Sequence, residues 1–263
     1  MYFFTLASSS SGNCALACAG ETRLLIDAGL SAARLEKALW AAGERPEKLT
    51  AILLTHEHID HVNGVARLAF KYGLPVYATP KTWANLPGAV EAVPDYLQKT
   101  YSYDLTLGDF QLDFCKTSHD AVQPVGLVLQ AEGRRLAYIT DTGCVTRGML
   151  AALSQPLDGL ILEANHDQQM LLHGPYPYHL KRRVSGEQGH LANGQAAELL
   201  RWYLGRNGLC RIMLAHLSET NNTPQLAYDS AAAVLADLLP AEEMPQWLCV
   251  APAKGQSEVW RFE

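Results

Sequence analysis

The stretch LLTHEHIDHVNG, residues 53–64, gathers three histidines and two acids within six positions directly after an apolar run. Crowding such polar side chains behind an apolar strand is costly unless they serve a common site. The string is not the HExxH motif of zinc proteases, because Asp60 stands where that motif needs histidine. We therefore expect a strand over 51–55, a helix from about Val62, and a metal-binding loop between them.

The spacing within this loop indicates two ions. Residues two apart in an extended segment point the same way, so His56 and His58 are expected to share one ion. Asp60 and His61 lie at the mouth of the predicted helix and are free to reach a second ion, while Glu57 is expected to face away. Imidazole and carboxylate ligands suit zinc, manganese or iron, so we expect two divalent ions of this kind as cofactors.

Further ligand-type residues follow other apolar stretches of the chain. They are Asp27, His119, Asp141 and His216. In α/β folds, ligand sites gather at the carboxyl ends of strands, so these side chains are expected to converge on one edge with the 56–61 cluster. Asp27 is also suited to orient a metal-binding imidazole through a hydrogen bond.

The two halves of the chain resemble each other. Residues 13–29 and 125–143 both read as hairpins ending in Asp-x-Gly, and 51–60 and 159–167 both read as apolar strands followed by histidine and acid. This echo indicates an α/β fold of two sheets packed face to face with helices outside. No low-complexity linker divides the chain, so we expect a single domain over 1–263.

Alternation and helical periodicity predict the individual elements. The expected strands are 2–7, 14–19, 22–27, 51–55, 75–78, 111–116, 125–131, 134–140, 159–163, 211–215, 247–251 and 257–261. The expected helices are 31–42, 62–72, 80–86, 145–153, 193–205 and 223–238.

Composition and sequence pattern indicate where the protein is located and which partners it can bind. The 263 residues carry a net charge of −6, which does not favour nucleic-acid binding by bulk charge and leaves only local contacts such as Arg182 and Arg183. The N-terminal residues lack the pattern of a signal peptide, and no apolar run is long enough for a membrane helix. We therefore expect a cytoplasmic protein without a membrane partner. The oligomeric state is not predicted.

The string HEHIDH resembles the HxHxDH signature of the metallo-β-lactamase superfamily. The order Asp27, HxHxDH, His119, Asp141 and His216 is also that of the superfamily's motifs. Segments resembling its YycJ/WalJ-type branch are SSSSGNC (8–14), TSHDAVQPVG (117–126), ITDTG (139–143), LEANHD (162–167), GHLANGQAA (189–197) and LAHLSETNNTP (214–224). Ala192 and Ser118 depart from the residues common in that branch, and neither change removes a ligand. The resemblance implies a four-layer αββα sandwich.

The resemblance also implies how the metal ligands are shared. The ligands of one ion would be His56, His58 and His119. The ligands of the other ion would be Asp60, His61 and His216. Asp141 would bridge the two ions, with a water or hydroxide between them. Asp27 would support the ligands from outside. Apart from the resemblance, the small-residue loop SSSSGN is short enough in its side chains to pass close to the metals, where Asn13 would brace the HxHxDH loop or meet a phosphate; a simple flexible connection is the alternative.

Two ions that share a hydroxide nucleophile suit phosphodiester hydrolysis, because they stabilise both the attacking and the leaving oxygen. The resemblance implies a DNA 5′-exonuclease connected with repair, so DNA or another phosphodiester is the expected substrate. His166 and His190 are candidates for the general acid or for phosphate contacts, with structural hydrogen bonding as the alternative, and Asp60 is expected to act as a ligand rather than a base. A small-molecule hydrolase (a cyclic phosphodiesterase, thioesterase or lactonase) is the competing interpretation.

Overall fold

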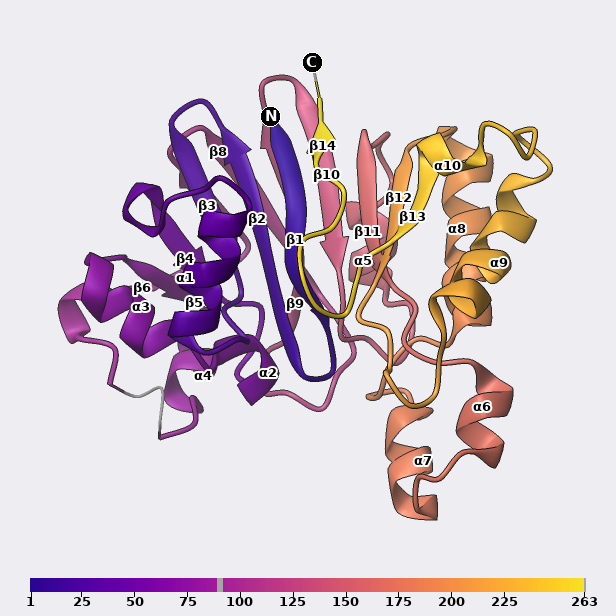
Figure 1. Ribbon diagram of the computed structural model, residues 1–263, viewed down its shortest axis with the longest axis horizontal. Helices are drawn as coiled ribbons and strands as arrows, with labels where there is room; N and C mark the ends of the chain where they lie inside the picture. The colour runs from indigo at the N-terminus through magenta and orange to yellow at the C-terminus, as the bar shows by residue number, and fades with distance from the viewer. Residues whose placement is uncertain (89–91, 263) are drawn as a thin grey trace.

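The computed structural model describes residues 1–88 and 92–262. Within these residues the chain forms two seven-stranded sheets packed face to face, with helices on both outer faces (Figure 1). The first sheet has the strand order β14-β1-β2-β3-β4-β5-β6. Its strands are β1 (Tyr2–Ser9), β2 (Gly12–Ala19), β3 (Thr22–Ile26), β4 (Ala51–Leu53), β5 (Val76–Ala78), β6 (Gln98–Thr100) and β14 (Trp260–Arg261).

The second sheet has the strand order β13-β12-β11-β10-β9-β8-β7. Its strands are β7 (Asp104–Leu107), β8 (Phe110–Lys116), β9 (Val125–Ala131), β10 (Arg134–Ile139), β11 (Gly159–Glu163), β12 (Arg211–Ala215) and β13 (Leu248–Val250). Strands β3 to β6 are parallel neighbours in one sheet, and β10 to β13 are parallel neighbours in the other. Their carboxyl ends therefore meet on one side of the molecule, the lower side in Figure 1.

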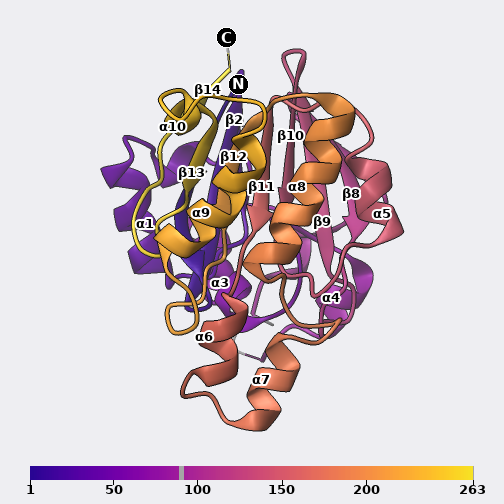
Figure 2. The same cartoon turned by 90° about the vertical axis from the view of Figure 1, so that its right-hand side faces the viewer.

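Helices cover the outer face of each sheet. Those beside the first sheet are α1 (Ala32–Ala41), α2 (Ile59–Val62), α3 (Val65–Tyr72) and α4 (Pro80–Ala84), with 3₁₀ turns at Pro46–Lys48 and Asp95–Leu97. Those beside the second sheet are α5 (Arg147–Ala152), α8 (Asn193–Asn207), α9 (Pro224–Leu235) and α10 (Met244–Trp247). Helices α6 (Gln168–His173) and α7 (Tyr178–Val184) project below the strand ends (Figures 1 and 2). No helix in the described ranges has the length and apolar character needed to cross a membrane.

Within the described residues, three clusters of buried apolar side chains hold the layers together. Alternate residues of a strand point to opposite faces, so on β2 Leu16 packs toward α1 and α3 while Ala17 faces the second sheet. On β10 the same alternation sends Tyr138 between the sheets and Ile139 toward α5 and α8. Because both faces of the inner strands are buried, each strand reads as a nearly continuous apolar run. The expected αββα sandwich is confirmed.

The internal echo corresponds to a repeated strand topology. In the first half, β2 pairs antiparallel with β3 and β3 pairs parallel with β4. In the second half, β9 pairs antiparallel with β10 and β10 pairs parallel with β11. Asp27 and Asp141 follow the equivalent strands β3 and β10, and both have a φ of 58°. The two halves thus place a carboxylate at matching strand ends in the same left-handed conformation.

The helix predicted over 62–72 is wrong at its start. The chain already turns helical at Ile59, so Asp60 and His61 belong to the short helix α2 rather than to a loop. The helix is then interrupted before α3, because the N–H of Gly64 donates to the carbonyl of Ala28 at 2.8 Å instead of to the carbonyl four residues before it. This bond ties α2 to the segment that follows β3.

Several short elements carry no apolar pattern and escape sequence prediction. Strands β6 and β7 are edge strands of their sheets; the sequence of β6, QKT, is entirely polar and that of β7, DLTL, is half polar. Helix α7 has no buried residue and α6 has only Leu171 buried, so neither shows a helical stripe. Helix α10 is a single turn.

Candidate metal centre

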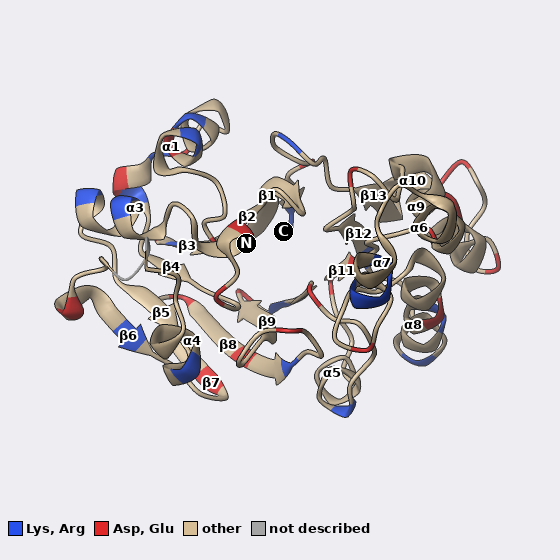
Figure 3. Ribbon diagram, turned by 90° about the horizontal axis from the view of Figure 1, so that it is seen from below, with Lys and Arg blue, Asp and Glu red and all other residues tan. Residues whose placement is uncertain are grey.

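The cluster of polar side chains lies where the parallel strands end. Asp27, Asp141 and His216 follow β3, β10 and β12 directly or within two residues, with φ values of 58°, 58° and 57°. Three non-glycine residues in the left-handed region are strained, and such strain concentrates at functional sites. Figure 3 shows this side of the molecule from below, with the ends of both sheets facing each other.

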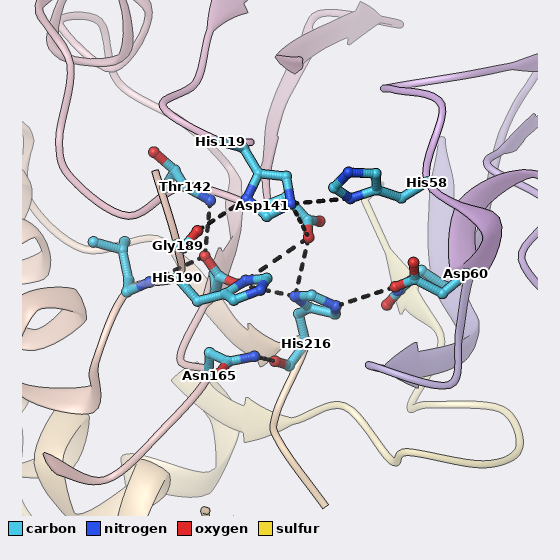
Figure 4. A network of polar contacts seen from close by, with 12 residues as sticks. His58, Asp60, His119, Asp141, Thr142, Asn165, Gly189, His190 and His216 are labelled. Carbon is cyan, nitrogen blue, oxygen red and sulfur yellow. Dashed lines mark hydrogen bonds and ion pairs between the residues drawn. The ribbon is translucent and has the colours of Figure 1, made fainter. Parts of the chain in front are cut away.

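One group of ligand-type atoms contains imidazoles alone. The ligand atoms of His56, His58 and His119 lie within 4.8 Å of one another. His119 Nε2 is 3.2 Å from His58 Nδ1, and His119 Nδ1 donates to the carbonyl of Gly189 at 2.9 Å (Figure 4). His56 Nδ1 contacts Thr55 Oγ1 at 3.0 Å, which leaves Nε2 of His56 for the group.

A second group combines a carboxylate with two imidazoles. The ligand atoms of Asp60, His61 and His216 also lie within 4.8 Å of one another. Asp60 Oδ2 is 3.4 Å from His61 Nε2 and 3.7 Å from His216 Nε2. The short helix α2 thus presents Asp60 and His61 to a histidine that follows β12, and Figure 4 shows Asp60 and His216 facing each other.

Asp141 lies between the two groups. Its Oδ1 is 3.7 Å from His119 Nε2, and its Oδ2 is 3.4 Å from His61 Nε2. It also shares a separate group of ligand-type atoms with His56 and His61. We call His56, His58 and His119 the imidazole group, and Asp60, His61 and His216 the mixed group. The carboxylate of Asp141 therefore reaches toward both groups, as a bridging ligand must.

The unpaired atoms of the cluster test whether metal ions fit. Within the part of the chain that the structure describes, the buried polar atoms without a hydrogen-bond partner include His56 Nε2, His216 Nε2 and Asp141 Oδ2, all of which belong to residues of the groups described above. A buried polar atom without a partner is costly, and a cation bound by lone pairs removes that cost. The residues present therefore fit divalent metal ions.

The electrostatics of the cluster favour positive charge at the mixed group. Burial opposes protonation of His216, but Asp141 and Asp60 outweigh it and raise the pKa of His216 to about 10. Burial also opposes protonation of His61, yet the same carboxylates raise its pKa well above the usual range. At His56 burial prevails and lowers the pKa well below the usual range. The carboxylates thus favour positive charge at the mixed group, and a metal ion bound there would take the place of the protons on His61 and His216. His56 is already neutral, which is the form that coordinates metal.

Asp27 holds one side of the cluster in place. Its carboxylate accepts hydrogen bonds from the N–H and Oγ1 of Thr55 at 2.8 and 2.9 Å, and its Oδ2 lies 2.8 Å from His61 Nδ1. Because Nδ1 of His61 is engaged, Nε2 is the nitrogen that faces the cluster. Asn13 Nδ2 lies 3.2 Å from Asp60 Oδ2 and 3.1 Å from His61 Nε2, so Asn13 braces the α2 residues.

Glu163 performs the corresponding task on the other side, and sequence reasoning did not single it out. Its Oε1 lies 2.7 Å from His190 Nδ1 and 2.9 Å from His216 Nδ1. Its Oε2 accepts from the N–H groups of Thr142 and Leu191 at 3.0 and 3.2 Å. The sequence did offer one sign of Glu163: an acidic residue ends the otherwise apolar strand 159–163. In the alignment of the two halves, Glu163 corresponds to Thr55.

The two histidines considered as acids lie in different surroundings. The ring of His190 lies 4.9 Å from that of His119 and 5.1 Å from that of His216, so His190 sits inside the cluster (Figure 4). Among the described residues, His166 belongs to none of the groups of ligand-type atoms. Its Nδ1 is buried without a partner, and it lines a separate pocket between α6, α7 and α8.

Glu57 and Arg183 are engaged elsewhere. Glu57 Oε1 accepts from the N–H of Val122 at 2.7 Å and so faces away from the cluster, bracing the loop that carries His119. Arg183 Nε donates to Asp120 Oδ2 at 2.6 Å, and although burial opposes ionisation of Asp120, this bond holds its pKa below the usual range. The charge of Arg183 is therefore already paired.

A sandwich of two sheets with a cluster of histidines and carboxylates at its strand ends is typical of metal-dependent hydrolases. The chain belongs to the β-lactamase superfamily, since residues 22–207 match the family described as "Beta-lactamase superfamily domain". The metallo-β-lactamase fold protein YhfI from Bacillus subtilis has a TM-score of 0.72 at 19% identity and covers 99% of both chains. Zn²⁺-bound PqqB from Methylobacterium extorquens has a TM-score of 0.69 at 19% identity, covering 98% of this chain and 100% of that one.

More similar sequences narrow the comparison within the superfamily. The chain is 38% identical over 227 residues to "Exodeoxyribonuclease WalJ" from Streptococcus pneumoniae serotype 2, covering 85% of this chain and 84% of that protein. It is 37% identical over 239 residues to "Exodeoxyribonuclease YycJ" from Bacillus anthracis, covering 90% of both. The resemblance inferred from the motifs is confirmed.

Proposed function

We propose that the chain is a metal-dependent phosphodiesterase that degrades DNA as a 5′-exonuclease and serves DNA repair in the cytoplasm. The observation that carries this proposal is the near-full-length similarity to two proteins named exodeoxyribonucleases, joined to a cluster of imidazoles and carboxylates around one bridging carboxylate. The 5′ polarity, the link to repair and the location extend the sequence-based hypothesis.

The proposed centre takes two divalent ions of zinc, manganese or iron. The residues that would hold one ion are His56, His58 and His119. The residues that would hold the other are Asp60, His61 and His216, with Asp141 shared between them. When bound, two such ions lower the pKa of a water held between them and polarise the phosphodiester.

The remaining residues orient the histidine ligands or transfer a proton to the substrate. Asp27 and Glu163 each occupy the Nδ1 side of a proposed ligand, His61 and His216, so that the Nε2 nitrogens face the cluster. His190 is held by Glu163 with its ring between His119 and His216, which is the position we assign to a phosphate contact or to the group that protonates the leaving oxygen. Asp60 acts as a ligand.

The test is a comparison of substrates on one preparation. Purified protein loaded with Mn²⁺ or Zn²⁺ is incubated with 5′-labelled duplex DNA, single-stranded DNA, bis-p-nitrophenyl phosphate and a thioester. The proposal predicts that the first cleavage releases the 5′ label as a mononucleotide, without a ladder of shortened 5′-labelled strands. Cleavage of the small diester or the thioester with DNA left intact would favour the small-molecule hydrolase and overturn the exonuclease assignment.

A further inference from the structure

A pocket of about 440 Å³ opens beside the metal centre, between α6, α7 and the start of α8. None of the roles assigned above uses it as a binding site. Its lining includes His166, Leu172, Tyr178, Lys181, Arg182 and Gln195. Figure 2 shows α6 and α7 side by side below α8, and Figure 3 shows α7 at the strand-end side of the molecule with its basic residues in blue.

The pocket adjoins the cluster through a short backbone segment. His166 and Ala192, which both line the pocket, form a parallel β-bridge, and the N–H of Asn193 donates to the carbonyl of His166 at 2.9 Å. Ala192 lies two residues beyond His190, so their Cα atoms are at most about 7 Å apart. This short separation matches a ligand whose phosphate lies beside His190 and whose attached group lies in the pocket.

The walls of the pocket suit a planar, uncharged ring. Tyr178 is 75% exposed and Leu172 is 61% exposed, which leaves an aromatic and an aliphatic surface unpacked at the pocket. The guanidinium of Arg182 lies 5.9 Å from the Tyr178 ring centroid, and no ion pair is found for Arg182 within the described residues. Aromatic rings flanked by arginine are the surfaces on which nucleic-acid bases stack.

The polar groups of the pocket suit the edge of a base. His166 is 2% exposed, and its Nδ1 has no hydrogen-bond partner among the residues of ranges 1–88 and 92–262. Burial lowers its pKa to about 4 and keeps the imidazole neutral at physiological pH. Gln195 uses Oε1 to accept from the N–H of Ala192 at 2.9 Å. Among the described lining residues there are two cations and no acid, in a chain of net charge −6.

The pocket wall is already assembled without a ligand. Lys181 Nζ donates to the carbonyl of Leu172 at 2.7 Å, which ties α7 to the C-terminal part of α6. Ser185 Oγ donates to the carbonyl of Lys181 at 2.9 Å and closes the end of α7. A preformed wall loses little conformational entropy when a ligand binds, so it favours a binding surface over a simple connection.

We propose that this pocket is a nucleoside subsite, which takes the base and sugar of the nucleotide whose phosphate lies at the metal centre. This inference rests on the proposed function and adds the part of the substrate that the metal ligands do not contact. Tyr178 provides the stacking surface, Arg182 faces the neighbouring backbone phosphate, and His166 with Gln195 contacts the edge of the base.

The first test measures binding by isothermal titration calorimetry. Thymidine 5′-monophosphate is compared with deoxyribose 5-phosphate on the wild-type protein, Tyr178→Ala and the control Tyr96→Ala. Tyr96 is also a highly exposed tyrosine (69%), but it precedes β6 and so lies at the opposite ends of the strands. Wild type and Tyr96→Ala are expected to bind the nucleotide about 10-fold more tightly than the sugar phosphate, and Tyr178→Ala is expected to lose this preference.

Equal affinity of the wild-type protein for both compounds, or an unchanged preference in Tyr178→Ala, would overturn the subsite. The second test separates this failure from failure of the proposed function. If wild type and Tyr178→Ala degrade DNA with the same KM, the exonuclease stands and the subsite is wrong. If the wild-type protein leaves DNA intact while Tyr178→Ala alone loses the nucleotide preference, the subsite stands and the exonuclease is wrong.

Discussion

At the scale of single residues, the cluster depends on what lies behind each imidazole. His61, His119 and His216 each engage Nδ1 with a protein acceptor, at 2.8, 2.9 and 2.9 Å respectively, which turns Nε2 toward the cluster. The sequence indicates the metal-facing residues because HxHxDH is a specific string. It indicates Asp27 through the Asp-x-Gly echo. Glu163 stands where the first half has Thr55, and only the folded chain shows that its carboxylate meets His190 and His216.

Glu163→Gln tests this orienting role. Each carboxylate oxygen of Glu163 faces two N–H groups, and an amide nitrogen cannot accept a hydrogen bond, so the substitution leaves two donors without a partner in either orientation. Metal affinity is expected to fall about 10- to 100-fold, measured by chelator competition. The control Glu198→Gln makes the same change on the exposed face of α8 and should retain metal. Equal affinity in both variants would contradict the role.

His166 gives a pH prediction that is independent of the metal ligands. Its pKa of about 4 in the folded protein lies below the ordinary value of about 6.5. Between these values the unfolded chain binds a proton that the folded chain does not, so stability is complete above pH 6.5 and falls toward pH 4. From pH 7 to pH 5, wild type should lose about 1–2 kcal/mol more unfolding free energy than His166→Asn in urea titrations. Identical losses would show that His166 titrates normally.

At the scale of elements, α2 is positioned by the segment after β3 rather than by its own sequence. The N–H of Ala28 donates to the carbonyl of His61 at 2.7 Å, and Gly64 returns a bond to Ala28. A pattern-based prediction could not place this turn, because it has only one helical turn and its apolar residues do not form a stripe. The long, periodic helices α1, α3, α8 and α9 were predicted, since each buries a regular apolar face.

Gly29→Ala tests the packing of α2. A Cβ at Gly29 would lie 1.7 Å from the carbonyl oxygen of Asp60, so the α2 turn must move away and carry Asp60 and His61 with it. We expect a loss of about 1–3 kcal/mol in unfolding free energy and less bound metal per chain. The control Gly194→Ala adds a Cβ with no atom within 4 Å and should be neutral or slightly stabilising. Full metal content in Gly29→Ala would contradict the account.

At the scale of the whole molecule, the cluster exists because two similar halves bring their strand ends together. The echo between 13–29 and 125–143 is visible in the sequence and leads to the face-to-face sheets. The contact between the two halves cannot be predicted from the sequence. It depends on apolar residues such as Phe3 and Tyr138, and every buried strand contains similar residues. The basic residues Arg182 and Arg183 are visible in the sequence despite the negative net charge, but only the fold places them on α7 at the strand-end side of the molecule.

We predict that residues 1–263 unfold as one domain. Strand β14 near the C-terminus pairs with β1 near the N-terminus, and a shared core lies between the sheets, so neither half keeps its packing alone. Tryptophan fluorescence and far-UV circular dichroism should therefore report the same midpoint in urea. Trp40 and Trp83 sample the first half, and Trp202 and Trp247 sample the second. Separate midpoints for the two signals would indicate two domains.

Asp141→Asn examines the central claim, a two-metal nuclease centre, most directly, because Asp141 is the one carboxylate proposed to serve both ions. Metal content by mass spectrometry and release of mononucleotides from 5′-labelled DNA are measured on the same samples, beside Asp237→Asn, an exposed control. The account predicts two ions per chain and DNA degradation in wild type and control. In Asp141→Asn it predicts loss of at least one ion and a rate reduced about 100-fold or more. Two retained ions with undiminished degradation in Asp141→Asn would contradict it.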